Sequence, residues 1–162
     1  MIYLLDVSAL IAFGLREHTF HERVARWVRA FEPREEVKLA TCAITELGLL
    51  RILTQTPSYN FAITQGKELL SQMKTTKGLR FTFLPDNQGV DDLPLWVKGP
   101  KQITDGHLLE LAKMHGAEMA TLDERIPGAV LIPGTRWLSA CQLARCFIQT
   151  FSLLELQKSH GV

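Results

Sequence analysis

The sequence predicts one α/β domain built around an open, mainly parallel sheet. Two stretches indicate this class: a short apolar run at 2–5 leads straight into a helical pattern, and the stretch 103–123 reads as a helix, a glycine stop and a short apolar strand. The 162 residues are 46% hydrophobic, which is enough for one domain with a substantial core. In sheets of this class, binding sites form outside the carboxyl ends of the strands.

Composition and charge limit the classes of function. A formal net charge of +1 indicates that any nucleic acid would be bound through local patches rather than through overall charge. Three cysteines in apolar surroundings favour buried thiols over a disulfide framework or a paired-cysteine metal site. The N-terminal run has no basic leader and contains Asp6, and no apolar stretch has the length of a membrane helix. We therefore expect a cytoplasmic protein that does not enter a membrane.

The first part of the chain is expected to supply two strands and three helices. The strand at 2–5 ends at Asp6, and either Asp6 or Ser8 can cap the helix that follows. Apolar residues in the next helix recur at i, i+4, i+7, i+8 and i+11, which is the spacing of an amphipathic helix. In chain order, we predict a strand at 2–5, helices at 8–13 and 18–31, a strand at 37–40 and a helix at 41–54.

The second part adds a long loop between two groups of regular elements. We predict a helix at 61–76, a strand at 81–84, a loop at 85–102, a helix at 103–116, and strands at 118–122 and 129–132. Thr104 can cap the helix at 103–116. The loop contains three prolines and two glycines, and a loop of this length beside a site can act as a lid. We expect its aspartates to be solvated.

The C-terminal segment is set apart by its unusually apolar helical pattern. We expect the domain to span 1–136 and a helical extension to span 137–162. The extension can pack on the domain, pair with another subunit or derive in part from sequence added to the natural chain. The sequence leaves these three alternatives open.

Four acids occupy positions from which the predicted fold can bring them to one pocket. Asp6 and Asp123 end strands, Asp105 lies at a helix start, and Glu46 falls on the apolar stripe of its helix. Each has a structural alternative. Asp6 can be a helix cap, Asp105 can interact with the helix dipole, and Asp123 can form a turn. Glu46 must find a partner, bind a metal, take up a proton or extend to water at the margin of the stripe.

Together, the four acids predict a divalent-metal site. Their carboxylates would repel one another in a shared pocket, and Mg²⁺ or Mn²⁺ with oxygen ligands would offset that repulsion. The chemistry that follows is hydrolysis of a phosphoryl or phosphodiester group. One ion activates a water, and a second ion about 3.5–4 Å away stabilises the leaving oxygen. The sequence lacks a phosphate loop, a dinucleotide-binding glycine turn and a zinc-type H-E-x-x-H motif.

Basic and imidazole side chains near the predicted pocket are less informative. Arg23, Arg26 and Arg29 form a row on one helix, and together with Arg125 they are candidates for phosphate contacts. A solvated helix face is the competing interpretation of the row. His18 and His21 are interpreted as solvated. His107 lies next to the predicted pocket, but its spacing from Asp105 directs it away, so we do not include it in the site.

The order of these motifs resembles the PIN domain, specifically the VapC toxin branch of toxin–antitoxin pairs. The motifs are D-x-S at 6–8, the helical Glu46, T-D-G at 104–106 followed by LLELAKMHG, and A-T-L-D at 120–123. The resemblance covers 1–134. It implies a small three-layer α/β/α domain with a central parallel sheet and a Mg²⁺- or Mn²⁺-dependent endoribonuclease that cuts single-stranded RNA. It also implies a homodimer and a cognate antitoxin whose tail covers the acidic pocket.

The resemblance also implies roles for individual residues. Those that match the metal-binding acids of the family are Asp6, Glu46, Asp105 and Asp123, and those that match hydroxyls orienting ligands or water are Ser8, Thr104 and Thr121. Gly106 stands where the family usually has alanine, which weakens the helix start slightly. The tail after Trp137 extends beyond the usual domain.

Two alternatives to a nuclease follow from the same residues. One is a catalytically inactive PIN-like module that binds RNA or a protein partner. The other is a phosphatase of the haloacid dehalogenase type, which also begins with a strand followed by an aspartate. That chemistry requires a second aspartate two residues after the first, where this chain has Ser8.

Overall fold

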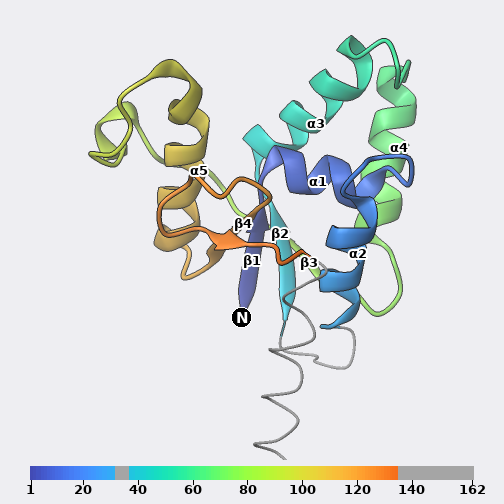
Figure 1. Ribbon diagram of the computed structural model, residues 1–162, viewed down its shortest axis with the longest axis horizontal. Helices are drawn as coiled ribbons and strands as arrows, with labels where there is room; N and C mark the ends of the chain where they lie inside the picture. The colour runs from blue at the N-terminus through green and yellow to red at the C-terminus, as the bar shows by residue number, and fades with distance from the viewer. Residues whose placement is uncertain (32–36, 135–162) are drawn as a thin grey trace, which may run out of the picture. The chain divides into compact units, whose positions relative to one another are not determined.

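A parallel sheet forms the centre of the fold. The computed structural model describes residues 1–31 and 37–134, and within these residues five strands all run parallel to their neighbours in the order β3-β2-β1-β4-β5 (Figure 1). This sheet confirms the predicted class. The strands are β1 (Ile2–Leu5), β2 (Lys38–Thr41), β3 (Phe81–Phe83), β4 (Glu118–Thr121) and β5 (Val130–Leu131). The order reverses between β1 and β4, and such a reversal opens a crevice at the carboxyl ends of the two strands.

Helices cover both faces of the sheet. They are α1 (Val7–Gly14), α2 (His21–Arg29), α3 (Ala43–Gln55), α4 (Ile63–Lys74) and α5 (Ile103–Met114). Figure 1 shows α5 on one face and the other four helices on the opposite face. The predicted three-layer α/β/α arrangement is therefore present. No helix in the described ranges is long and apolar enough to cross a lipid bilayer.

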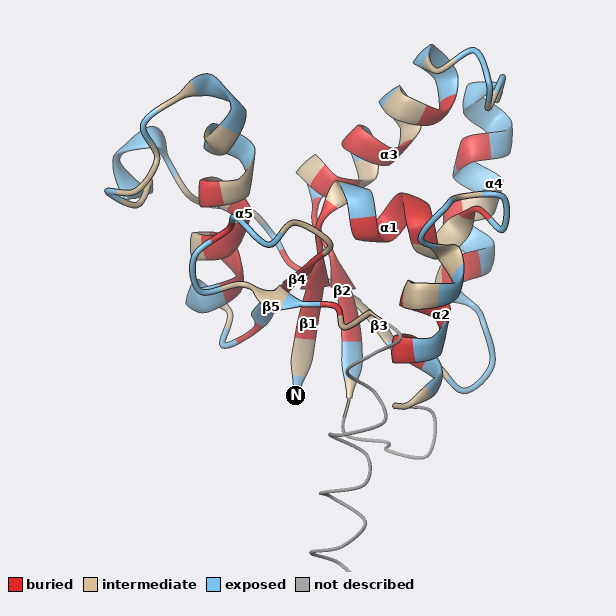
Figure 2. Ribbon diagram, in the orientation of Figure 1, coloured by how far each residue is buried: buried red, intermediate tan, exposed pale blue. Residues whose placement is uncertain are grey.

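Side-chain alternation along β1 divides the core into two parts. Tyr3 and Leu5 pack with α1 and its neighbours, whereas Leu4 packs with Met119 and Leu108 on the α5 side. Figure 2 shows β1, β2 and β4 largely buried along their length. Burial on both faces explains why the strands appear in the sequence as continuous apolar runs rather than alternating ones.

Helix boundaries differ from the prediction where local hydrogen bonds decide them. The helix predicted at 41–54 begins at Ala43, because Cys42 is its extended N-cap residue and its backbone N–H donates to Thr45 Oγ1 at 3.0 Å. Thr104 does not cap the helix predicted at 103–116. A 3₁₀ turn, η2 (Pro100–Gln102), leads directly into α5 and places Thr104 inside the first helical turn.

The long loop between β3 and α5 packs against the start of α5. It contains a 3₁₀ turn, η1 (Val90–Asp92), before η2. A Cβ atom at Gly106 would collide with Val97 Cγ2 and lie 3.2 Å from Pro94 Cδ. Glycine at this position therefore lets the loop approach the helix, which gives a packing reason for the departure from the alanine usual in the resembled family. The predicted extension at 137–162, and the boundary after residue 136, lie outside the described residues.

Candidate active site

Three of the four predicted acids line one cavity at the carboxyl ends of β1 and β4. Asp6 directly follows β1, Asp123 lies just beyond β4, and Asp105 lies in the first turn of α5. The cavity has a volume of about 430 Å³. Because β1 pairs with β4, residues far apart in the sequence meet at the point where the strand order reverses.

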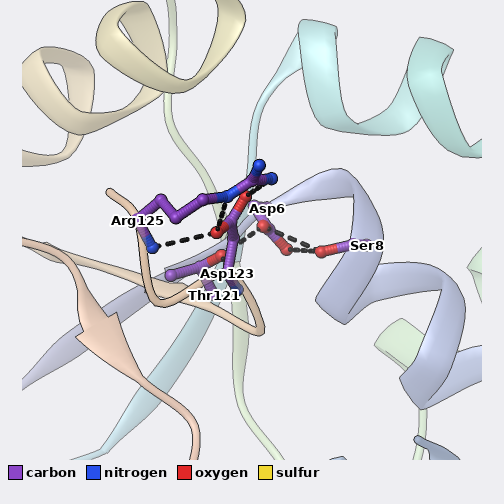
Figure 3. Close-up of polar contacts among 5 residues, drawn as sticks. All are labelled: Asp6, Ser8, Thr121, Asp123 and Arg125. Carbon is purple, nitrogen blue, oxygen red and sulfur yellow. Dashed lines mark hydrogen bonds and ion pairs between the residues drawn. The ribbon is translucent and has the colours of Figure 1, made fainter. Parts of the chain in front are cut away.

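Asp6 is held in place by several donors. Its carboxylate accepts a 2.6 Å hydrogen bond from the Ala9 backbone. It also accepts 2.9 Å bonds from Ser8 Oγ and a 2.6 Å bond from Thr121 Oγ1 (Figure 3). Only 5% of the residue is exposed. Asp6, rather than Ser8, is the N-cap of α1. The capping interpretation and the site interpretation of Asp6 are therefore compatible, because one carboxylate starts the helix and lines the cavity.

Thr121 connects Asp6 to Asp123. Its hydroxyl donates to Asp6 Oδ2 and accepts a 3.0 Å hydrogen bond from the Asp123 backbone. The side chain is buried at the end of β4. Ser8 and Thr121 thus both place hydroxyls against the Asp6 carboxylate, and Thr104 lines the cavity. Such contacts restrict the rotation of a carboxylate and so define where its free oxygen lone pairs point.

Arg125 holds the carboxylate of Asp123 with two parallel contacts. Its Nε lies 2.9 Å from Oδ1 and its Nη2 lies 2.7 Å from Oδ2 (Figure 3). The Arg125 backbone also donates to Oδ1 at 2.9 Å, which is the turn expected of Asp123. The Arg125 side chain is 88% exposed. Arg125 was predicted to contact phosphate, and in this structure its guanidinium pairs with an acid of the candidate site.

Burial, neighbouring charges and hydrogen bonds give the three aspartates different pKa values. Burial raises the pKa of Asp6, and the nearby charge of Asp123 raises it further, while hydrogen bonds from Thr121, Ala9 and Ser8 oppose the rise. The pKa of Asp105 is raised by burial and then by the charges of Asp6 and Asp123. Hydrogen bonds from Arg125 lower the pKa of Asp123 to about 2. The cavity therefore concentrates negative charge that Arg125 only partly offsets.

Glu46 lies at the same edge of the sheet but turns toward α4. Its Oε1 accepts a 2.5 Å hydrogen bond from Thr41 Oγ1 and lies 2.5 Å from Lys74 Nζ. Of the alternatives open to an acid on an apolar stripe, the structure selects a charged partner. Among the described residues, those that line the cavity do not include Glu46. The structure thus brings Asp6, Asp105 and Asp123 together and leaves the fourth predicted acid apart.

The donor set fits a hard divalent cation, although two of its four acids are paired with basic side chains. In the described part of the chain, no three His, Cys, Asp or Glu side chains already converge on one metal position. Two of the four acids are paired with cations, Asp123 with Arg125 and Glu46 with Lys74. The donors are carboxylate and hydroxyl oxygens, which suit Mg²⁺ or Mn²⁺. Burial is the main cause of the raised pKa values of Asp6 and Asp105, and the charges of neighbouring aspartates raise both further.

The predicted row of arginines divides between two environments. Arg23 donates to the carbonyl oxygen of Ile132 through Nε at 2.7 Å and through Nη2. Arg26 is exposed, and Arg29 forms an exposed 3.4 Å ion pair with Glu22. The solvated-face interpretation therefore holds for Arg26 and Arg29, whereas Arg23 and Arg125 line a second hollow beside the cavity.

Two aromatic residues of the cavity were missed by sequence reasoning. His18 and Tyr59 line the cavity, although His18 was interpreted as solvated. Burial lowers the pKa of His18, and the neighbouring His21 lowers it further. Both residues lie in connections between helices, where no periodicity marks the buried side. His107 points away as predicted, because its Nε2 donates to Asp86 Oδ2 at 2.7 Å.

Known proteins match this chain over most of its described length. A family model described as the PIN domain matches residues 3–129. Ribonuclease VapC38 of Mycobacterium tuberculosis is 36% identical over 124 residues, which cover 74% of this chain and 84% of that protein. Ribonuclease VapC29 of the same organism is 32% identical over 141 residues, which cover 83% of this chain and 99% of that protein.

Solved structures share the fold at lower sequence identity. The structure of VapBC2 from Rickettsia felis, bound to a DNA fragment from its promoter, aligns with a TM-score of 0.55 and 13% identity over 81% of this chain and 97% of that one. Mycobacterium tuberculosis VapC20, a toxin that cleaves the sarcin–ricin loop, aligns with a TM-score of 0.54 and 10% identity over 81% of this chain and 99% of that one. These structures agree with the three-layer arrangement.

Proposed function

The chain belongs to the PIN domain family, and we propose that it is a divalent-metal-dependent endoribonuclease that acts as the toxin of a toxin–antitoxin pair. One observation carries the proposal: Asp6, Asp105 and Asp123 line one cavity at the point where the strand order reverses. Relatives that match most of this chain are named ribonucleases. The haloacid dehalogenase alternative lacks this support.

The three aspartates would hold Mg²⁺ or Mn²⁺, and Glu46 would join them once its carboxylate leaves Lys74. When bound, the metal supplies an activated water and stabilises the leaving oxygen of the phosphodiester. Asp6 is the most rigid donor, because Ser8, Thr121 and the Ala9 backbone hold it. Asp123 becomes available when the exposed Arg125 side chain moves from its carboxylate to a phosphate oxygen of the substrate.

The proposal includes partners and a location. The substrate is RNA, and a cognate antitoxin would neutralise the enzyme by covering the acidic cavity. VapBC2, a similar solved structure, is bound to promoter DNA, which supports a toxin–antitoxin context. We further propose a homodimer in the cytoplasm.

The test is cleavage of single-stranded RNA by the purified protein with Mg²⁺, with Mn²⁺ or with EDTA. Asp105→Asn is the informative variant, because Asp105 is not the cap of its helix and its raised pKa indicates that removing the charge will not destabilise the fold. The matched control is Asp91→Asn in the exposed loop. We expect metal-dependent cleavage by the wild type and Asp91→Asn, and loss of cleavage in Asp105→Asn. Equal cleavage by all three proteins would exclude the site.

A catalytically inactive binding module remains the second candidate, and one observation favours it. Arg125 and Lys74 pair with Asp123 and Glu46, so two of the four acids have a partner without a metal. Calorimetric titration with Mn²⁺ separates the two candidates. A nuclease binds the ion at the aspartate cavity, and Asp105→Asn weakens that binding, whereas an inactive module gives no heat of binding.

A further inference from the structure

A second hollow lies beside the aspartate cavity and shares a wall with it. Its volume is about 570 Å³, and Ser8 and Asp123 line both spaces. The remaining wall includes Phe20, Arg23 and Arg125. A chain that places one phosphodiester at the aspartates would therefore continue directly into this hollow.

Phe20 presents an aromatic surface in the second hollow. The residue is 44% exposed, and the Arg23 guanidinium carbon lies 5.9 Å from the centre of its ring. Arg23 is anchored by the carbonyl oxygen of Ile132, so this cation stays beside the ring. An exposed aromatic ring beside arginine is the arrangement on which unpaired nucleic-acid bases stack.

Fold stability does not account for phenylalanine at this position. Phe20 is the N-cap residue of α2, and its side chain forms no capping hydrogen bond. Ser, Thr, Asp and Asn are the residues that stabilise a helix at this position. The half-exposed ring at this N-cap therefore leaves an aromatic surface open to a ligand in the second hollow.

The two spaces each receive a ring from the same connection between α1 and α2. His18 lines the aspartate cavity and Phe20 lines the second hollow, with their ring centres 5.9 Å apart. Adjacent bases of one strand would thus meet one ring on each side of the shared wall. Duplex RNA keeps its bases stacked inside the helix, so this arrangement favours an unpaired strand.

We propose that the second hollow is a nucleotide subsite for single-stranded RNA, in which Phe20 stacks on the base next to the phosphodiester that is cut. This inference rests on the proposed ribonuclease function and adds where the neighbouring nucleotide binds. Arg125 lines the second hollow and pairs with Asp123, a residue of both spaces, so its guanidinium is placed to contact the phosphate of that nucleotide.

Phe20→Leu tests the stacking contact, and Phe83→Leu is its matched control. Phe83 is 49% exposed and also has a cation, Lys74 Nζ, 5.9 Å from its ring centre, but it lines neither space. With fluorescein-labelled single-stranded RNA of randomised sequence and Mn²⁺, we expect Phe20→Leu to raise KM about tenfold, because the variant loses one base-stacking contact. We expect kcat to stay within about twofold, Phe83→Leu to match the wild type, and Phe20→Trp to restore KM.

The outcomes separate this inference from the function on which it rests. Cleavage by the wild type with equal KM values for Phe20→Leu and Phe83→Leu overturns the subsite and leaves the ribonuclease intact. If the wild type cleaves no RNA, the ribonuclease proposal fails, and fluorescence anisotropy of the labelled RNA in EDTA decides the subsite. In that measurement, weaker binding by Phe20→Leu than by Phe83→Leu supports the subsite, and equal binding rejects it.

Discussion

Asp6 and Glu46 lie at the same edge of the sheet in different surroundings. Asp6 is buried against two hydroxyls and a helix N-terminus, with Asp105 and Asp123 as charged neighbours. Glu46 is 22% exposed and contacts one hydroxyl and Lys74. Asp6 thus remains in a cluster of negative charge, whereas Glu46 has its own cation.

The comparison separates an acid that shares its cavity with other acids from an acid that already has a cation as partner. Each carboxylate accepts a hydrogen bond from a buried threonine at the end of a strand, Thr121 for Asp6 and Thr41 for Glu46. Hydroxyl contact alone therefore does not mark a metal ligand. Crowding with like charge is what distinguishes Asp6, and it supports the proposed metal site because burial of acids without a cation costs free energy that a divalent ion would offset.

The largest expected effect concerns the two carboxylates themselves. Asp6→Asn keeps a good helix cap but loses the charge, and we expect metal-dependent RNA cleavage to fall on the order of a thousandfold or more. Glu46→Gln should lower cleavage by roughly tenfold, because its carboxylate must first leave Lys74. Initial rates at saturating Mn²⁺ measure both. Equal losses of cleavage would mean that Glu46 contributes to the metal site as much as Asp6 does.

The two threonines provide a closer comparison. Thr121→Val removes the hydroxyl that orients Asp6 and accepts from the Asp123 backbone, and we expect roughly 10–100-fold weaker Mn²⁺ binding. Thr41→Val, at the matching position beside Glu46, should change the Mn²⁺ dissociation constant less than about threefold. Calorimetry gives both values. A larger effect at Thr41 would mean that Glu46, rather than Asp6, is the main metal ligand of the two.

Removing the basic partners should change Mn²⁺ affinity less than the threonine variant Thr121→Val does, and should raise the affinity rather than lower it. Arg125→Gln frees Asp123, so we expect Mn²⁺ to bind about two- to fivefold more tightly, as is typical for loss of a competing exposed ion pair. Lys74→Met frees Glu46 and should tighten binding by no more than this. The same titrations provide the measurement. Weaker Mn²⁺ binding by Arg125→Gln would mean that Arg125 supports the metal site rather than competing with it.

The smallest expected effect is on the pH dependence of stability in EDTA. The pKa of Asp123 is lowered from 3.8 to about 2, so its pairing with Arg125 stabilises the fold above pH 3.8 and this contribution is lost as pH falls toward about 2. Asp6 has a raised pKa, so its ionisation destabilises the fold as pH rises above 3.8. Thermal unfolding should show a shallower acid-side loss in Arg125→Gln and a smaller decline above pH 3.8 in Asp6→Asn. Unchanged pH profiles in both variants would contradict these charge assignments.

The regular elements were predictable because each is specified by local pattern. Short apolar runs bounded by charged residues, prolines or glycines marked the strands, and helical periodicity marked the helices. The prediction was less accurate at element ends, where backbone hydrogen bonds decide. The extended Cys42 moved the start of α3, and the turn at Pro100–Gln102 removed the capping role of Thr104. The sequence also indicated that Asp6 and Asp123 end strands, which is a local property.

What the sequence alone determined about this protein is its α/β class, its family and the chain positions of its acids, since these depend on residue type and spacing. The tertiary structure decided which acids meet. The pairing of β1 with β4 joins Asp6 to Thr121 and Asp123, and the end of α4 places Lys74 on Glu46. Contacts between residues distant in the chain depend on strand order and helix packing, and local spacing contains no information about a partner on another element.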